Sequence, residues 1–205
     1  MSQLFIAVLA FISLLPGAAL IRASGAEFPC LQILDPAAAA RAQIAELAPK
    51  LGGKTVVSEL SGGEVFRRYN DTGSIIGSNY VLYPRDEIMV IDFIKVEASY
   101  RKTGVSRLLI AEPIARHPEI RVIKATLAWV NAGAFFHALN STALKTLEGK
   151  APTPLSAKAR SDVELEALGH TPLFRVIKSL GFSHVTTLKD HGDQIEITVE
   201  RSALP

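Results

Sequence analysis

The sequence predicts an α/β domain in which strands and helices alternate along one chain. Three observations indicate this class. The chain begins its globular part with apolar residues at helical spacing, continues through several short runs of β-branched and aromatic residues, and contains one almost continuously apolar run, Ile88–Val96, typical of a strand covered on both faces. The 205 residues are 48% apolar and 20% charged, which suits one domain with a substantial core.

Charge and cysteine content exclude several kinds of partner and site. The 22 Lys and Arg residues and the 20 Asp and Glu residues leave a net charge of +2, so no basic excess is present to neutralise a nucleic acid. A single cysteine excludes an internal disulfide framework and a thiolate-rich zinc site. The histidines lack metal-ligand spacing, and we therefore expect no metal.

The first 26 residues are expected to be a secretory signal peptide. Residues 4–15 form an apolar run, Pro16-Gly17 ends it, and the small residues up to Ala26 suit signal-peptidase cleavage. An uncleaved N-terminal membrane anchor and a buried helix remain open as alternatives. The pattern predicts a secreted or periplasmic protein with a mature domain at 27–205, and no membrane contact beyond a possible N-terminal anchor.

The expected elements of the first half follow from local chemistry. Asp35-Pro36 is a helix opening, because a capping side chain precedes a residue preset for the first turn. Gly52-Gly53 ends that helix. Clusters of turn-forming residues separate the four strands expected at 55–60, 64–69, 75–83 and 88–96.

In the second half, a helix is expected to begin near Gly104 and to end or kink near Glu112, because Pro113 follows. The remaining elements are expected to be a buried strand at 120–130, a helix at 132–147, a linker at 149–162, a helix at 172–180, and strands at 184–189 and 194–201.

The informative segment is Ile88–Ile110, which combines a buried strand, a short loop and a helix that starts at a glycine. This geometry presents unpaired backbone N–H groups at the positive end of a helix dipole, as a phosphate or pyrophosphate site requires. Gly104 would let the backbone approach the anion closely, while Arg101 and Lys102 would supply positive charge.

The segment Val96-Glu-Ala-Ser-Tyr100-Arg101-Lys102-Thr103-Gly104-Val105-Ser106 resembles the core signature of the GNAT family of acetyl-CoA-dependent N-acyltransferases. Ser106 stands where a glycine or alanine is usual, and it is small enough to keep the turn tight. Further resemblances are Asn131, where the family's fifth strand often ends, and Ser179-Leu-Gly-Phe182 with the two strands after it. The match covers roughly residues 55–136 and 171–201.

The resemblance implies a three-layer α-β-α fold with a mixed, largely antiparallel central sheet and an insertion at about 138–170. It implies acetyl-CoA as cosubstrate, with cofactor-binding residues in the loop and at two strand ends: Val96, Arg101, Lys102, Thr103, Gly104, Val105, Ser106 and Asn131. A backbone N–H near Val96 would polarise the thioester carbonyl. The acceptor would be an amine of a small molecule or a peptide.

Two residues are candidates for catalysis. Asp92 interrupts the apolar strand, where alternation places it on the face of Val90, Ile94 and Val96. It would be either a general base or one half of a buried ion pair. The tyrosine that many members use to protonate the departing thiolate is Ile177 here, and His137 is the nearest residue able to replace it.

The N-terminus and the motif point to different compartments, because acyl-CoA is an intracellular metabolite. Three hypotheses follow: delivery into a compartment that holds acyl-CoA, a membrane-tethered enzyme, or a catalytically inactive GNAT-like domain that acts as a secreted binding module.

Overall fold

The computed structural model describes residues 35–128, 130–147, 157–191 and 193–201. Two compact units divide the chain, Met1–Gln32 and Ile33–Pro205, and every described element lies in the second. The expected signal peptide at 1–26 therefore falls outside the described residues. Within them, no helix is both long enough and apolar enough to span a bilayer.

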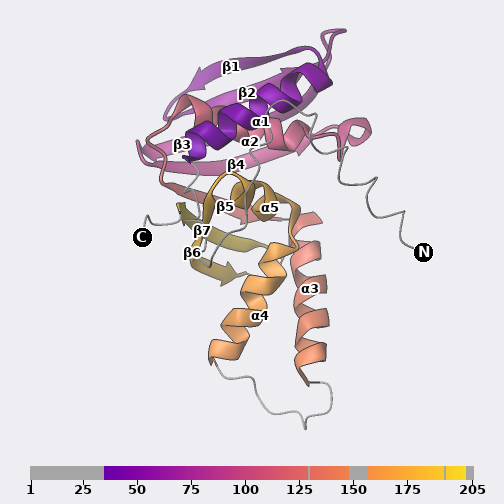
Figure 1. The fold of residues 1–205 in the computed structure, drawn as a ribbon, viewed down its shortest axis with the longest axis vertical. Coiled ribbons are helices and arrows are strands. Elements are labelled where there is room, and N and C mark those ends of the chain that lie inside the picture. The colour runs from indigo at the N-terminus through magenta and orange to yellow at the C-terminus, as the bar shows by residue number, and fades with distance from the viewer. Residues whose placement is uncertain (1–34, 129, 148–156, 192, 202–205) are drawn as a thin grey trace, which may run out of the picture. The chain divides into compact units, whose positions relative to one another are not determined.

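Seven strands form one mixed sheet in the order β1-β2-β3-β4-β5-β7-β6, and β4 with β5 is its parallel pair (Figure 1). The strands are β1 (Lys54–Leu60), β2 (Gly63–Tyr69), β3 (Ile75–Arg85), β4 (Ile88–Val96), β5 (Val122–Leu127), β6 (Phe182–Asp190) and β7 (Ile195–Arg201). All other neighbours pair antiparallel. The predicted α/β class with a mixed, largely antiparallel sheet is confirmed.

The described helices are α1 (Pro36–Leu51), α2 (Val105–Arg116), α3 (Val130–Leu147), α4 (Ala157–Gly169) and α5 (Pro172–Ser179), with a short 3-10 helix, η2 (Ala98–Tyr100), after β4. The predicted linker at 149–162 is wrong from residue 157 onward, because α4 begins there. Helices α3 and α4 pack against each other and against α5, and most of this pair falls in the expected insertion (Figure 1).

Helix α2 continues through Pro113 to Arg116, so an end near Glu112, one of the two expected outcomes, is wrong. A proline has no N–H, and the carbonyl four residues earlier, on Leu109, therefore loses its helical donor. The buried side chain of Asn79 in β3 takes that place, and its Nδ2 donates to the Leu109 carbonyl at 2.8 Å. A strand residue thus satisfies the helix at the position where the proline leaves it unsatisfied.

Helix α2 packs closely against β3 because Gly77 has no side chain. A Cβ atom at Gly77 would lie 2.8 Å from Val105 and 2.9 Å from Leu109, both of which are buried. Gly77 and Asn79 therefore face α2, and alternation turns Ser78 and Tyr80 to the opposite face of the sheet.

The core is continuous between α2, the sheet and α5. Ile91 of β4 is buried in the same cluster as Ile123 of β5 and Ile197 of β7, together with Phe174 and Ile177 of α5. The parallel and antiparallel registers place these strand residues on the face that α2 covers. Helices α2 and α5 consequently lie over neighbouring parts of one face.

Candidate functional site

The N-terminus of α2 carries no side-chain cap. Its N-cap residue, Gly104, has a φ of 103°, and the first helical bond runs from Leu108 N–H to the Gly104 carbonyl at 3.0 Å. The N–H groups of residues 105–107 therefore have no partner within the helix. Lys102, two residues earlier, also has a positive φ of 65°. The loop thus exposes backbone donors at the positive end of the helix dipole.

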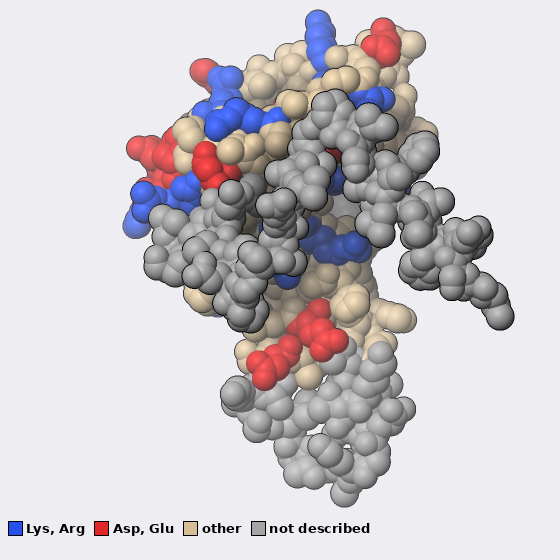
Figure 2. Space-filling model, viewed as in Figure 1, with Lys and Arg blue, Asp and Glu red and all other residues tan. Residues whose placement is uncertain are grey.

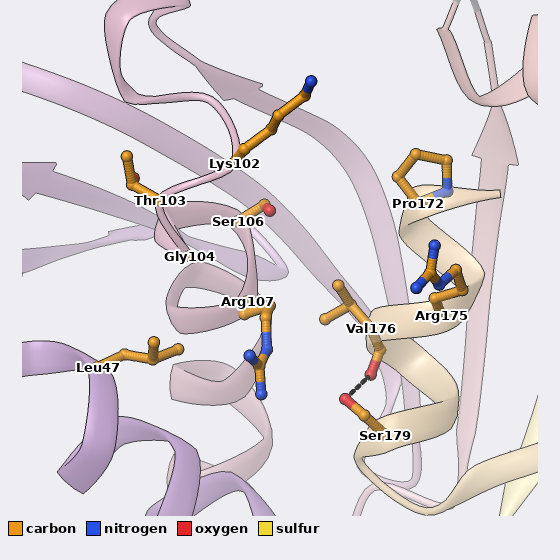
Figure 3. A pocket seen from close by; sticks show the side chains of 10 residues that line it. All are labelled: Leu47, Lys102, Thr103, Gly104, Ser106, Arg107, Pro172, Arg175, Val176 and Ser179. Atoms are coloured by element: carbon orange, nitrogen blue, oxygen red, sulfur yellow. Dashed lines mark hydrogen bonds between the residues drawn. The ribbon is translucent and has the colours of Figure 1, made fainter.

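A pocket of about 510 Å³ opens at this helix end, between α1, α2 and α5 (Figure 3). Ten residues line it: Leu47, Lys102, Thr103, Gly104, Ser106, Arg107, Pro172, Arg175, Val176 and Ser179. Three of them are cations, and none of these described lining residues is acidic. Arg107 of α2 and Arg175 of α5 lie on opposite sides of the gap, with Val176 of α5 between them and Ser106 on the α2 side (Figure 3).

Positive charge also shows at the surface. Figure 2 shows Lys and Arg side chains at the centre of this face, apart from the Asp and Glu side chains lower down. The helix dipole and the side chains therefore favour the same class of ligand, an anion with more than one charge.

Polar contacts hold the two outer walls of the pocket. On the α1 side, Gln43 Nε2 donates to the hydroxyl of Ser179 at 3.0 Å, which ties α1 to α5. On the α5 side, the N–H of Leu173 donates to the side chain of Asn131 at 2.9 Å. Thr171, the N-cap residue of α5, makes no side-chain cap bond, so Asn131 supplies the cap from α3.

The structure brings together four of the predicted cofactor-binding residues, Lys102, Thr103, Gly104 and Ser106. Arg101 is exposed and does not line the pocket, and Val105 is buried against Gly77. Asn131 does not line the pocket, and its side-chain oxygen accepts the N–H of Leu173 and so caps α5. Its assignment as a cofactor contact stays a prediction.

Gly104 lines the pocket and also has a structural role. The space where its Cβ would project is filled by Leu47 of α1, whose nearest carbon would lie 2.9 Å away. The glycine therefore serves the left-handed turn and the packing of α1. Sequence reasoning did not identify the α1 and α5 residues of the pocket, nor Arg107. Arg107 directly follows the motif and could have been identified from it. The α5 residues could not, because α5 lies about 70 residues further along the chain.

Strands β4 and β5 separate before β4 reaches the loop that leads to this pocket. Their pairing runs from Ile88–Val122 to Ile91–Ala125, and β4 then continues to Val96 without β5 as a neighbour. The N–H of Glu97 donates to Ile76 of β3 at 3.0 Å, so alternation turns the N–H of Val96 to the opposite edge. That donor therefore points to the edge of β4 that β5 has left.

Asp92 lies at this point of divergence, but the expected burial is wrong. Tyr80 pairs with Phe93 and Val81 pairs with Ile91, so Asp92 is the extra residue of a β-bulge. The bulge interrupts the alternation from which its position was predicted, and the side chain is exposed. The buried ion pair considered for Asp92 is therefore excluded, while a role in proton transfer is not tested by this geometry.

The expected proton donor is not in the pocket. His137 is exposed on α3 and does not line it. Ile177 is fully buried on the core side of α5, opposite the helix face that carries Arg175 and Val176. Among the described lining residues, the ammonium group of Lys102 and the hydroxyl groups of Thr103, Ser106 and Ser179 could donate a proton.

Two groups with shifted pKa values, Tyr83 of β3 and Glu112 of α2, lie outside the pocket. Burial, followed by the hydrogen bond and charge of Glu64, raises the pKa of Tyr83 well above its usual range. Burial also raises the pKa of Glu112, although the Thr55 hydroxyl donates to its carboxylate at 2.6 Å. Tyr83 and Glu64 lie with Arg116 and His117 at the C-terminal end of the helix, and they anchor that end to the sheet.

No group of three or more His, Cys, Asp or Glu side chains lies close enough to hold a metal ion within the part of the chain that the structure describes.

Comparisons with known proteins give structural matches only. No protein-family model and no curated protein matches the chain. Nourseothricin acetyltransferase is 17% identical over 68% of this chain, with a TM-score of 0.38, and this chain covers 65% of its length. An aminoglycoside 6′-N-acetyltransferase complexed with coenzyme A is 11% identical over 70% of this chain and 74% of its own, with a TM-score of 0.40. A Bacillus subtilis acetyltransferase in complex with CoA is 12% identical over 74% and 99%, with a TM-score of 0.41.

The chain resembles GNAT-family acetyltransferases. The motif from Val96 to Ser106 is a strand end, a loop and a helix start, as the resemblance implies. At these identities and scores, the matches do not indicate an activity or a substrate for this chain. Both are inferred from its own residues.

Proposed function

We propose that this protein is a GNAT-type N-acyltransferase that moves an acyl group, preferably acetyl, from acyl-CoA to an amine. The observation that carries the proposal is the uncapped N-terminus of α2, which opens into a pocket with three cations and no described acidic lining residue. Strand β4, whose Val96 N–H points to the edge without β5, leads through a short loop into this helix N-terminus. Anion binding and carbonyl polarisation are thus served by neighbouring parts of the fold.

The residues of the pocket fit the nucleotide part of CoA. The N–H groups of residues 105–107 would donate to the pyrophosphate oxygens. Arg107 and Arg175, on opposite walls, would each contact a phosphate group through charge-assisted hydrogen bonds. Val176, Pro172 and Leu47 give the pocket an apolar lining that suits the rest of the nucleotide.

The thioester supplies an activated acyl group. The N–H of Val96 would donate to the carbonyl oxygen as negative charge develops there, which lowers the barrier to attack. The amine nitrogen forms a bond to the carbonyl carbon, the carbon–sulfur bond breaks, and the sulfur leaves as a thiolate. The nitrogen loses one proton and the thiolate gains one, so N-acyl product and CoA thiol result. We assign Asp92, exposed at the strand divergence, as the group that accepts the proton from the amine.

The nucleotide assignment is tested by CoA titration of the full chain and of two charge-reversal variants, Arg107→Glu and Arg175→Glu. Each should weaken CoA binding by about 10- to 100-fold, since a hydrogen bond to a charged group contributes about 1.5–3 kcal/mol. Arg101→Glu is the matched control, because it makes the same charge change in the loop before α2 but outside the pocket. Equal weakening by all three variants would show that net charge, rather than this pocket, binds the ligand.

A second measurement separates enzyme from binding module. The wild type is incubated with [¹⁴C]acetyl-CoA and a mixture of primary amines, and acylated products are counted. CoA binding without any product would favour the catalytically inactive module.

A further inference from the structure

We infer that the exposed sheet face at the divergence of β4 and β5 is the acceptor site, and that it selects a primary amine with an aromatic or bulky apolar body. The inference rests on the proposed function, because it assigns the second substrate of the same reaction.

The site lies on the face of the sheet that α2 does not cover. Gly77 and Asn79 face α2, so Tyr80 faces the other way, and Tyr80 pairs directly with Phe93 of β4. The two rings meet edge to face, with centroids 5.9 Å apart and planes at 72°. Phe93 is nevertheless 39% exposed. An aromatic pair with one accessible member is thus present at the strand edge.

The neighbouring residue, Asp92, adds a carboxylate to this aromatic pair. Asp92 directly precedes Phe93, and the bulge leaves it without a cross-strand partner on β3. Its side chain is exposed, as is that of Phe93. A carboxylate next to accessible aromatic faces suits a ligand that is cationic at one end and apolar at the other, because the ring faces attract both cations and apolar groups.

The position of this patch relative to the pocket favours a substrate over a structural partner. Beyond Ile91 and Ala125, no strand closes the space between β4 and β5. An acyl arm held by the pocket on the α2 side can therefore reach this gap, where the Val96 N–H points. An amine on the opposite face, held by Asp92 and Phe93, would meet the arm at the same strand edge.

The inference predicts a ranking of acceptors. In the full chain, 2-phenylethylamine should be acetylated with a kcat/KM at least about tenfold above that of ethanolamine, which carries the same charge without the ring. Phe93→Ala should raise KM for 2-phenylethylamine by about 10- to 100-fold, the loss expected for one buried aromatic contact. CoA affinity should not change. Leu60→Ala is the matched control, because it also removes an exposed apolar side chain from a strand of this sheet, but on β1.

A binding measurement keeps the inference testable in the absence of turnover. With CoA present, 4-fluorophenylethylamine should show a ¹⁹F shift that saturates with wild type and Leu60→Ala but is lost with Phe93→Ala. Such binding without product would support the site and overturn the proposed catalysis. If CoA binds and ethanolamine is acetylated as well as 2-phenylethylamine, the acceptor inference is wrong although the proposed function stands. The inference also fails if no amine binds, or if light scattering shows a dimer that Phe93→Ala dissociates.

Discussion

Asn79 and Pro113 form a coupled pair whose energy can be measured. Asn79 is fully buried, and its Nδ2 satisfies the Leu109 carbonyl that Pro113 leaves without a donor. Asn79→Leu keeps the shape of the side chain but removes the donor. An unsatisfied buried carbonyl costs about 1–3 kcal/mol, and loss of the amide oxygen, which has no described partner, offsets part of that cost. We therefore expect a net loss of about 1–2 kcal/mol in the free energy of unfolding.

The matched background is Pro113→Ala, which restores an N–H at residue 113. Its helical acceptor is the Leu109 carbonyl, so Asn79→Leu should cost about 1 kcal/mol less in that background. Urea denaturation of the four proteins gives the coupling energy. Equal losses in both backgrounds would refute the account, because they would show that Asn79 stabilises the fold for some other reason than replacing the missing helical donor.

Three further predictions concern single groups. Burial raises the pKa of Glu112 above its ordinary value of 4.5, so the folded state binds this proton more tightly than the unfolded state does. The free energy of unfolding should therefore fall as pH rises from about 4.5 through the raised pKa. Glu112→Gln should remove that part of the pH dependence in thermal melts. Asp92→Asn should lower kcat by about 10²-fold or more if Asp92 accepts the proton. The free energy of unfolding should change by no more than about 0.5 kcal/mol, because the side chain is exposed. An unchanged kcat would show that Asp92 takes no part in the mechanism. Intact-mass analysis of exported protein should find a chain beginning at Glu27, whereas a mass that includes residues 1–26 would favour the membrane anchor.

Local chemistry made most of the fold predictable. Asp35 caps α1 as its position before Pro36 indicates, and the apolar run Ile88–Val96 is a strand with those bounds. The continuation of α2 through Pro113 could not be predicted locally, because the donor that replaces the missing N–H of Pro113 is a strand residue 34 positions earlier. Nothing in the sequence near Pro113 shows that Asn79 will face it.

The candidate site was predictable on one side only. The loop before α2 has a local signature, so Lys102, Thr103, Gly104 and Ser106 could be identified. Arg175 and Ser179 join the pocket only because α5 packs beside α2, and helical spacing alone does not show this. The bulge at Asp92 depends on how β3 and β4 pair, and one strand read by itself predicts plain alternation.

The most direct test of the central claim is calorimetric titration of the full chain with CoA and with 3′-dephospho-CoA. We expect saturable binding of CoA with a Kd of about 1 mM or tighter, within the usual range for substrates, and weaker binding once one phosphate is removed. Arg107→Glu and Arg175→Glu should each weaken CoA binding, while Arg101→Glu should have a smaller effect. No heat of binding at millimolar CoA, in a protein that melts cooperatively, would contradict the assignment of this pocket to acyl-CoA.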